Sequence, residues 1–232
     1  MQTIPITNIL YMLVPVVIVG YFYVKWIGNT TEIAYASVRM VSQLLLIGYA
    51  LSFIFSSDSL WLMLAILLFM IGASSLIALR NFKDKTWQSY LLLFSAIALG
   101  GTFNLAIVIF LVLNLDLQTP EVIIPLAGMI YANAMNAVAL CAERYESEIK
   151  QKSYYEARKD AFRASMIPQI NSFLAVGLVS LPGMMTGQIL SGVDPLIAVR
   201  YQIVVMAMIL GSSGISTVLF LFWQKNRRRK AV

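Results

Sequence analysis

The sequence predicts an all-α, polytopic membrane protein with about seven transmembrane helices, on three observations. Of its 232 residues, 59% are hydrophobic and only 12% are charged, and the mean hydropathy is +0.79. A soluble domain is close to half apolar and about a quarter charged, so this chain is too apolar to be one. Apolar runs of about 20 residues, each long enough to cross a bilayer, recur along it.

Seven such runs are found. The first has no basic leader and no small-residue cleavage site, so we interpret it as a retained span rather than a signal peptide. The sixth is interrupted by Pro182 and Gly183. The predicted spans are residues 4–24, 36–55, 60–79, 87–115, 122–142, 167–190 and 199–223.

The longest polar segment, residues 143–166, separates the fifth span from the sixth. Glu146 and Lys150 are four residues apart, as are Glu148 and Lys152, which favours a solvated helix. Either the fifth helix extends beyond the membrane, or a separate docking helix lies here. We therefore expect one transmembrane domain over residues 1–232, with a cytoplasmic helical segment at about 143–166.

The basic residues predict the orientation of the chain. With the basic tail at residues 225–230 in the cytoplasm, seven spans place the N-terminus outside. All of the 17 Lys and Arg residues except Arg200 then lie on the cytoplasmic side, as the positive-inside rule requires. The net charge of +6 is thus explained by basic residues that face an anionic leaflet and the cytosol. No nucleic-acid partner is therefore expected.

Composition also limits the chemistry. The chain has one cysteine, Cys141, and no histidine, which largely excludes His- and Cys-based metal or catalytic sites. It has no GxxxxGK[ST] phosphate loop, so we expect a non-enzymatic chain without a cofactor, and any ATP must be used by a partner. Four acids at the predicted outer ends are spread over three loops and do not form a ligand set: Asp58, Asp116, Glu121 and Asp194.

Polar and sulfur-containing side chains within the spans are the candidates for a transport pathway. Carboxylates are missing from the middle of every predicted span, which argues against proton or sodium coupling. These side chains can instead have structural roles: Arg39 can snorkel to the headgroups, the amides can form hydrogen bonds between helices, and the methionines can fill gaps in the packing. The candidates are Arg39, Gln43, Asn133, Asn136, Asn171, Met184, Met185 and Gln188.

The sixth span contains a candidate hinge. Pro182 lacks a backbone donor and clashes with the preceding helical turn, and Gly183 relaxes the local backbone restriction. Gly183 and Gly187 form a GxxxG pattern, which permits close helix approach. A gate and a simple packing kink are both compatible with this pattern.

The same region resembles the FetB family of membrane permeases, which belong to an ABC-type system implicated in iron export and have plant relatives that act in aluminium tolerance. The long string VGLVSLPGMMTGQILSG at residues 176–192 is the most specific part of the resemblance. The other matching segments are residues 124–130 with 133–135, 167–168 with 171–172, 194–195 with 198–203, and Arg39, Gln43, Gly48 and Tyr49.

The resemblance implies a permease subunit in the bacterial inner membrane that exports a metal ion, iron in this family. It further implies a separate ATP-hydrolysing subunit and a complex of two permeases with two ATPases. Basic residues of the polar segment, Arg144, Arg158 and Arg163, are then candidates for ATPase docking. That segment lacks a small-residue element resembling Leu-Gly-Ala, which favours an alternative: an ATPase-independent facilitator or regulatory scaffold.

Overall fold

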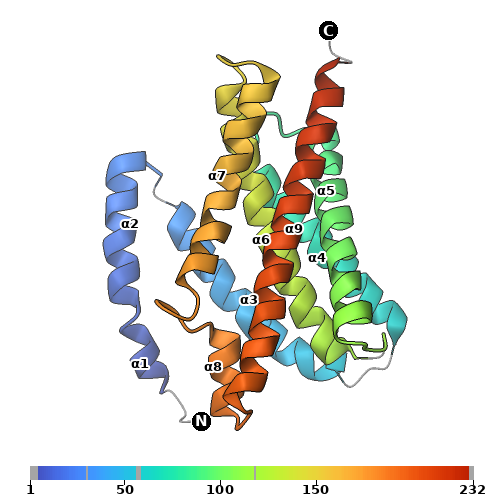
Figure 1. Ribbon diagram of the computed structural model, residues 1–232. Coiled ribbons are helices and arrows are strands. Elements are labelled where there is room, and N and C mark those ends of the chain that lie inside the picture. The colour runs from blue at the N-terminus through green and yellow to red at the C-terminus, as the bar shows by residue number, and fades with distance from the viewer. Residues whose placement is uncertain (1–4, 30, 56–58, 118, 230–232) are drawn as a thin grey trace. The chain divides into compact units, whose positions relative to one another are not determined.

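The computed structural model describes residues 5–29, 31–55, 59–117 and 119–229. Ile4, Asp58 and Lys230, which the sequence predictions include, lie outside these ranges. The chain comprises two compact units, residues 1–57 and 58–232, and each is described by itself. Figure 1 shows the helices of both units with their labels.

The first unit contains α1 (Ile6–Leu10), α2 (Leu13–Ile27) and α3 (Glu32–Phe55). α2 ends at Gly28, which adopts the left-handed conformation (φ 80°) favoured at helix C-termini. The hydroxyl of Tyr23 then donates a hydrogen bond of 2.6 Å to Glu32 in the first turn of α3. None of the described side chains of α2 is buried, as expected for an apolar helix whose solvent is lipid.

The second unit is a helical bundle built around α5, α6 and α9 (Figure 1). Ser59 and Thr86 cap the first two of its helices, because their side-chain oxygens accept the N–H of Leu62 and Ser89. Its elements are α4 (Leu60–Leu79), α5 (Trp87–Ala106) continuing into the π-helical turn η1 (Ile107–Val112), α6 (Pro120–Glu148), α7 (Tyr154–Ala175), α8 (Gly183–Leu190) and α9 (Pro195–Arg229).

Small residues allow the central helices to approach closely. A Cβ added at Gly100 of α5 would clash with backbone atoms of Ser216 in α9, and one at Gly211 of α9 would clash with the side chain of Asn104. A Cβ at Gly101 would lie 2.6 Å from the ring of Tyr131 in α6. The predicted close approach at Gly183 and Gly187 is not seen, because a Cβ at either meets nothing within 4 Å.

Six helices in the described part of the chain are long and apolar enough to cross a membrane, which confirms a polytopic all-α protein. They correspond to six of the seven predicted spans. The remaining prediction, the sixth span over residues 167–190 with a break at Pro182 and Gly183, is corrected in the place of its break: α7 ends at Ala175 and α8 begins only at Gly183. The polar segment contributes both the end of α6 and the separate start of α7, with a turn at residues 149–153 between them.

Candidate functional site

The chain between α7 and α8 forms a tight turn whose backbone groups are largely satisfied within the turn itself. The carbonyl of Ala175 accepts hydrogen bonds from Leu178, Val179 and Ser180, at 2.8–3.2 Å. Gly177 adopts φ +83°, a conformation that glycine reaches without strain, and its N–H donates to the carbonyl of Ser180 at 3.0 Å. The helix is therefore interrupted without leaving a row of unpaired groups.

The predicted hinge residues lie at the start of α8. Pro182 directly precedes this helix in an extended conformation (φ −62°, ψ 142°), so it begins a helix and does not kink one. Its carbonyl accepts both the N–H (3.0 Å) and the hydroxyl (3.1 Å) of Thr186. The sequence analysis missed Gly177 and Gly192, which have φ of +83° and +92° and flank α8 on both sides.

A cavity of about 550 Å³ lies between the end of η1, α6, α8 and α9. It contains two of the predicted pathway residues, Met184 and Gln188, which are four residues apart on one face of α8. The other lining residues come from the end of η1, from α6 and from α9. Its lining consists of Leu113, Leu115, Glu121, Val122, Pro125, Leu126, Met129, Met184, Gln188, Tyr201, Val204 and Val205.

One face of α6 brings Glu121, Pro125 and Met129 into this cavity at four-residue intervals. Pro125 has no N–H, so the main-chain carbonyl of Glu121 loses its usual partner four residues later. On α8, the side-chain oxygen of Gln188 is buried without a hydrogen-bond partner among the described residues. A buried acceptor without a partner, such as this oxygen of Gln188, can accept a hydrogen bond from a ligand or water, or contact a cation.

The cavity therefore combines one carboxylate, one amide, one phenol and two thioethers, from Glu121, Gln188, Tyr201, Met129 and Met184. Oxygen ligands suit hard and borderline cations, and thioethers suit softer ones. Within the described part of the chain, no group of three or more Asp, Glu, Cys or His side chains forms a metal-binding cluster. A sparse donor set of this kind suits a cation that must enter and leave, because transport sites bind weakly enough to release.

A second cavity of about 390 Å³ lies between the end of α7, α8 and α9. Met185 and Pro182 line this cavity, whereas Met184 and Gln188 line the first. Gln202 of α9 also lines it, and the side-chain oxygen of Gln202 has no partner among the described residues. α8 thus contributes adjacent methionines to two different cavities.

The other predicted pathway residues lie outside these two cavities. Asn133 donates a hydrogen bond of 2.8 Å to the carbonyl of Met129 in its own helix, and Asn136 and Asn171 are exposed. Arg39 and Gln43 lie four residues apart in α3 of the first unit. Three donor-bearing residues of the first cavity were not selected as pathway candidates by sequence reasoning: Glu121, Met129 and Tyr201.

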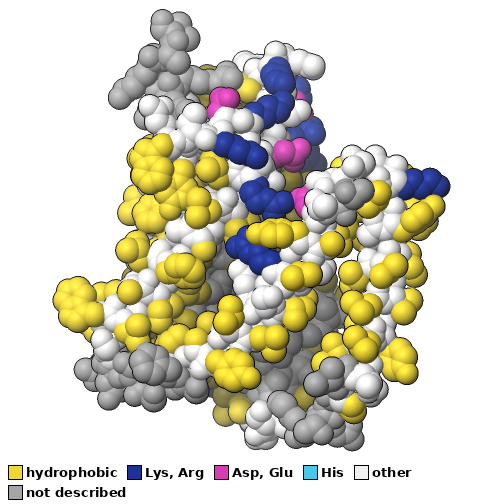
Figure 2. Space-filling model, turned by 180° about the vertical axis from the view of Figure 1, so that it is seen from behind, with side chains coloured by type: hydrophobic (Ala, Val, Ile, Leu, Met, Phe, Trp, Pro, Cys, Tyr) yellow, Lys and Arg dark blue, Asp and Glu magenta, His cyan; other side chains and the backbone are white. Residues whose placement is uncertain are grey.

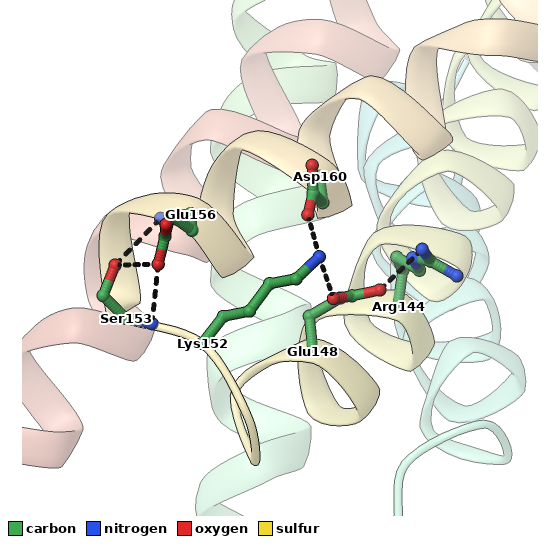
Figure 3. Close-up of polar contacts among 6 residues, drawn as sticks. All are labelled: Arg144, Glu148, Lys152, Ser153, Glu156 and Asp160. Atoms are coloured by element: carbon green, nitrogen blue, oxygen red, sulfur yellow. Dashed lines mark hydrogen bonds and ion pairs between the residues drawn. The ribbon is translucent and has the colours of Figure 1, made fainter.

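At the other end of the second unit, charged residues surround the turn between α6 and α7. Figure 2 shows Lys and Arg side chains gathered towards this end, with hydrophobic side chains covering much of the surface below them. In Figure 3, Glu148 pairs with both Arg144 (2.5 Å) and Lys152 (2.6 Å), and Lys152 also pairs with Asp160 of α7 (2.7 Å). This ion-pair chain connects the two helices across the turn.

A capping box begins α7. Ser153 accepts the N–H of Glu156, and the Glu156 carboxylate accepts the N–H (3.1 Å) and hydroxyl (2.8 Å) of Ser153. These hydrogen bonds hold the pKa of Glu156 below its ordinary value. The hydrogen bond from Lys152 likewise lowers the pKa of Asp160, and the hydrogen bonds to Asp160 and Glu148 raise the pKa of Lys152.

The three predicted docking arginines are divided between two grooves. Arg144 lines a polar groove between α6 and α7. Arg158 lines a groove between α7 and α9, and Arg163 contributes to both. Arg163 is thus the residue that the two grooves share.

Comparison with known proteins places this architecture in a family. The model of an uncharacterised protein family, UPF0014, matches residues 6–156 and 150–228. The probable iron export permease protein FetB of Escherichia coli is 36% identical over 222 residues, covering 87% of this chain and 84% of FetB. No solved structure matches.

Other relatives come from distant organisms. The membrane protein YjkA of Bacillus subtilis is 32% identical over 208 residues, covering 83% of this chain and 82% of YjkA. Protein ALUMINUM SENSITIVE 3 of Arabidopsis thaliana is 32% identical over 211 residues, covering 83% of this chain and 76% of that protein. With a family match over nearly its whole length and relatives of this similarity, the chain belongs to the UPF0014 family of multi-pass membrane proteins.

Proposed function

We propose that this chain is the permease subunit of an ATP-driven transporter that exports a metal ion, with iron as the first candidate substrate. The observation that carries the proposal is the cavity lined by Glu121, Met129, Met184, Gln188 and Tyr201. It offers a negative charge and further neutral donors between helices that span the membrane. The name of the FetB relative, a probable iron export permease, supports iron.

Gating is assigned to α8. This helix contributes Met184 and Gln188 to one cavity and Met185 to the other. A Cβ added at Gly183 or Gly187 of this helix would meet nothing within 4 Å, and the left-handed glycines at 177 and 192 border the helix. We infer that α8 moves as a short rigid element and opens the two cavities alternately.

We propose that a separate ATP-binding subunit of the ABC type supplies the energy for transport. This subunit docks at the turn between α6 and α7, and the complex contains two copies of this chain. The ion-pair chain of Arg144, Glu148, Lys152 and Asp160 makes this turn a stiff connection between α6 and α7. Arg144 is the docking arginine that this geometry favours. Arg158 and Arg163 lie along the groove with α9, which is considered below.

A second candidate function is an ATPase-independent facilitator. The specific observation in its favour is the short α6–α7 connection of residues 149–153, which adds no separate docking helix between the two. In this case the same cavity would conduct the ion without ATP.

One reconstitution experiment separates the two functions. The chain is co-purified with the ABC-type ATPase of its genome neighbourhood, reconstituted in liposomes, and ATP hydrolysis is measured with ferrous iron, manganese, zinc, copper(I), magnesium and nucleotide sugars. The permease proposal predicts co-purification and stimulation by ferrous iron, with no stimulation by nucleotide sugars. Failure to co-purify, together with iron flux in liposomes that lack the ATPase, would establish the facilitator.

A further inference from the structure

The groove between α7 and α9 joins a basic face to an apolar face. It has a volume of about 520 Å³. Arg158, Lys159 and Arg163 line it from α7, and none of its described lining residues is acidic. Phe162 of α7 and Val218 and Phe222 of α9 supply apolar walls.

The groove lies where α9 approaches the charged end of the unit. The apolar part of α9 that can cross a membrane runs from Pro195 to Lys225, so Val218 and Phe222 belong to its last turns at this end. The hydroxyl of Tyr154 donates a hydrogen bond of 3.0 Å to the carbonyl of Leu221 and fixes the start of α7 against α9. The basic face therefore lies at the level expected for lipid headgroups.

Positive charge is concentrated at the entrance to the groove. The Arg158 guanidinium lies 5.7 Å from the ring centre of Tyr154 and 5.3 Å from that of Tyr155. The Lys225 ammonium lies 5.5 Å and 5.3 Å from the same two ring centres. Cation–π contacts orient these side chains but leave their charge available to an anion.

The acids of this part of α7 are engaged elsewhere. Glu156 is held by Ser153 in the capping box, and Asp160 is held by Lys152 on the side of α6 (Figure 3). Among the described residues, Arg158, Lys159 and Arg163 form no ion pair with a carboxylate. The charges on the edge of α7 towards α6 are thus neutralised within the protein, whereas the positive charges on the edge towards α9 are not.

We propose that this groove binds the headgroup of an anionic phospholipid from the leaflet at the charged end of the protein. Guanidinium groups donate paired hydrogen bonds to phosphate oxygens, and basic pockets between transmembrane helices are suited to such headgroups. An acyl chain then lies against Phe162, Val218 and Phe222. The lipid holds α7 and α9 together beside the turn that couples to a partner.

Native mass spectrometry of the full-length chain in detergent, titrated with phosphatidylglycerol or phosphatidylcholine, tests this proposal. The test variant changes Arg158, Lys159 and Arg163 to Gln. The matched control changes Lys83, Lys85 and Lys150 to Gln, because these three cations lie at the same end but do not line the groove. Because the test variant loses the charge-assisted hydrogen bonds to the phosphate and the control does not, phosphatidylglycerol affinity is expected to fall by about tenfold or more in the test variant and by less than about twofold in the control.

Two comparisons on folded protein complete the test. The unaltered chain should retain phosphatidylglycerol saturably, and excess phosphatidylcholine should not displace it. The Arg158→Lys and Arg163→Lys double variant should bind phosphatidylglycerol more tightly than the test variant but more weakly than the unaltered chain, because the charges remain and the paired hydrogen bonds are lost. Equal retention of both lipids by the unaltered chain, or equal losses in the test and control variants, would overturn the proposal. So would a test variant that retains the lipid but loses a partner ATPase, which would identify the groove as a protein-docking surface.

Discussion

Gly100 is expected to be intolerant of even a methyl group, because α5 lies against the backbone of α9 at this point. A Cβ at Gly100 would lie 2.7 Å from the backbone nitrogen and 2.9 Å from the Cα of Ser216. Overpacking a core costs about 1–3 kcal/mol, and the upper part of this range applies because a backbone cannot rotate away. Alanine recovers about 1 kcal/mol of helix propensity, so Gly100→Ala should lower the free energy of unfolding by about 1–2 kcal/mol.

Gly72→Ala in α4 is the matched control, because the nearest atom to its Cβ is the Tyr90 hydroxyl at 3.5 Å, an ordinary contact. This variant should be more stable than the unaltered protein by about 1 kcal/mol. Both are measured by unfolding in mixed micelles with increasing SDS. Adding Ser216→Ala to Gly100→Ala should restore stability only in part, since it removes the clash with the Ser216 hydroxyl but leaves those with its backbone nitrogen and Cα. Equal stability of the two glycine variants would refute the packing described for α5 and α9.

Three further predictions concern α8, the capping box and α3. Pro182→Ala with Gly183→Ala should extend α8 towards its N-terminus, since alanine is favoured over glycine by about 1 kcal/mol in a helix. We expect this double variant to insert into the membrane and to bind the ATPase normally but to lose transport. Its expression level is measured alongside. Because its folded pKa is lowered, Glu156 stabilises the start of α7 above the ordinary carboxyl pKa of about 4, and this stability is lost as the pH falls. The protection factors of the amides at residues 153–157, which are corrected for the intrinsic pH dependence of exchange, should therefore fall on acidification. Glu156→Gln, which keeps the capping box, should remove this loss of protection. Arg39→Lys is expected to reduce transport partially. Full activity would indicate that Arg39 only snorkels, and complete loss would indicate a planar or bidentate contact that lysine cannot make.

The apolar runs predicted the helices well, because a bilayer requires long apolar segments with internal hydrogen bonding. The prediction of residues 60–79 coincides with α4. The sixth predicted span was wrong in the place of its break, because Pro182 was interpreted as a kink within a helix. In fact the left-handed Gly177 and the turn that follows it end α7 seven residues earlier.

The candidate site was predictable only in part. Met184 could be selected for its thioether, and Gln188 as a polar side chain at the end of the sixth predicted span. Glu121 appeared to be one of four scattered loop acids, and only the packing of α6 against α8 and α9 brings it into the cavity. Close helix approach was predicted at Gly183 and Gly187 from a local pattern, but it depends on what faces the glycine, which is Ser216 at Gly100 and Asn104 at Gly211.

The most direct test of the proposed metal pathway is ATP-dependent uptake of radioactive ferrous iron by inside-out vesicles that contain this chain and its ATPase. Glu121→Gln removes the single carboxylate that lines the cavity. Uptake should fall by about tenfold or more, because a contact to a charged group contributes roughly 1.5–3 kcal/mol. Glu121→Asp should retain part of the activity, and Asp116→Asn, an acid outside the cavity lining, should transport normally. Uptake at the unaltered rate by Glu121→Gln, at equal protein and ATPase levels, would contradict the assignment of this cavity to metal export.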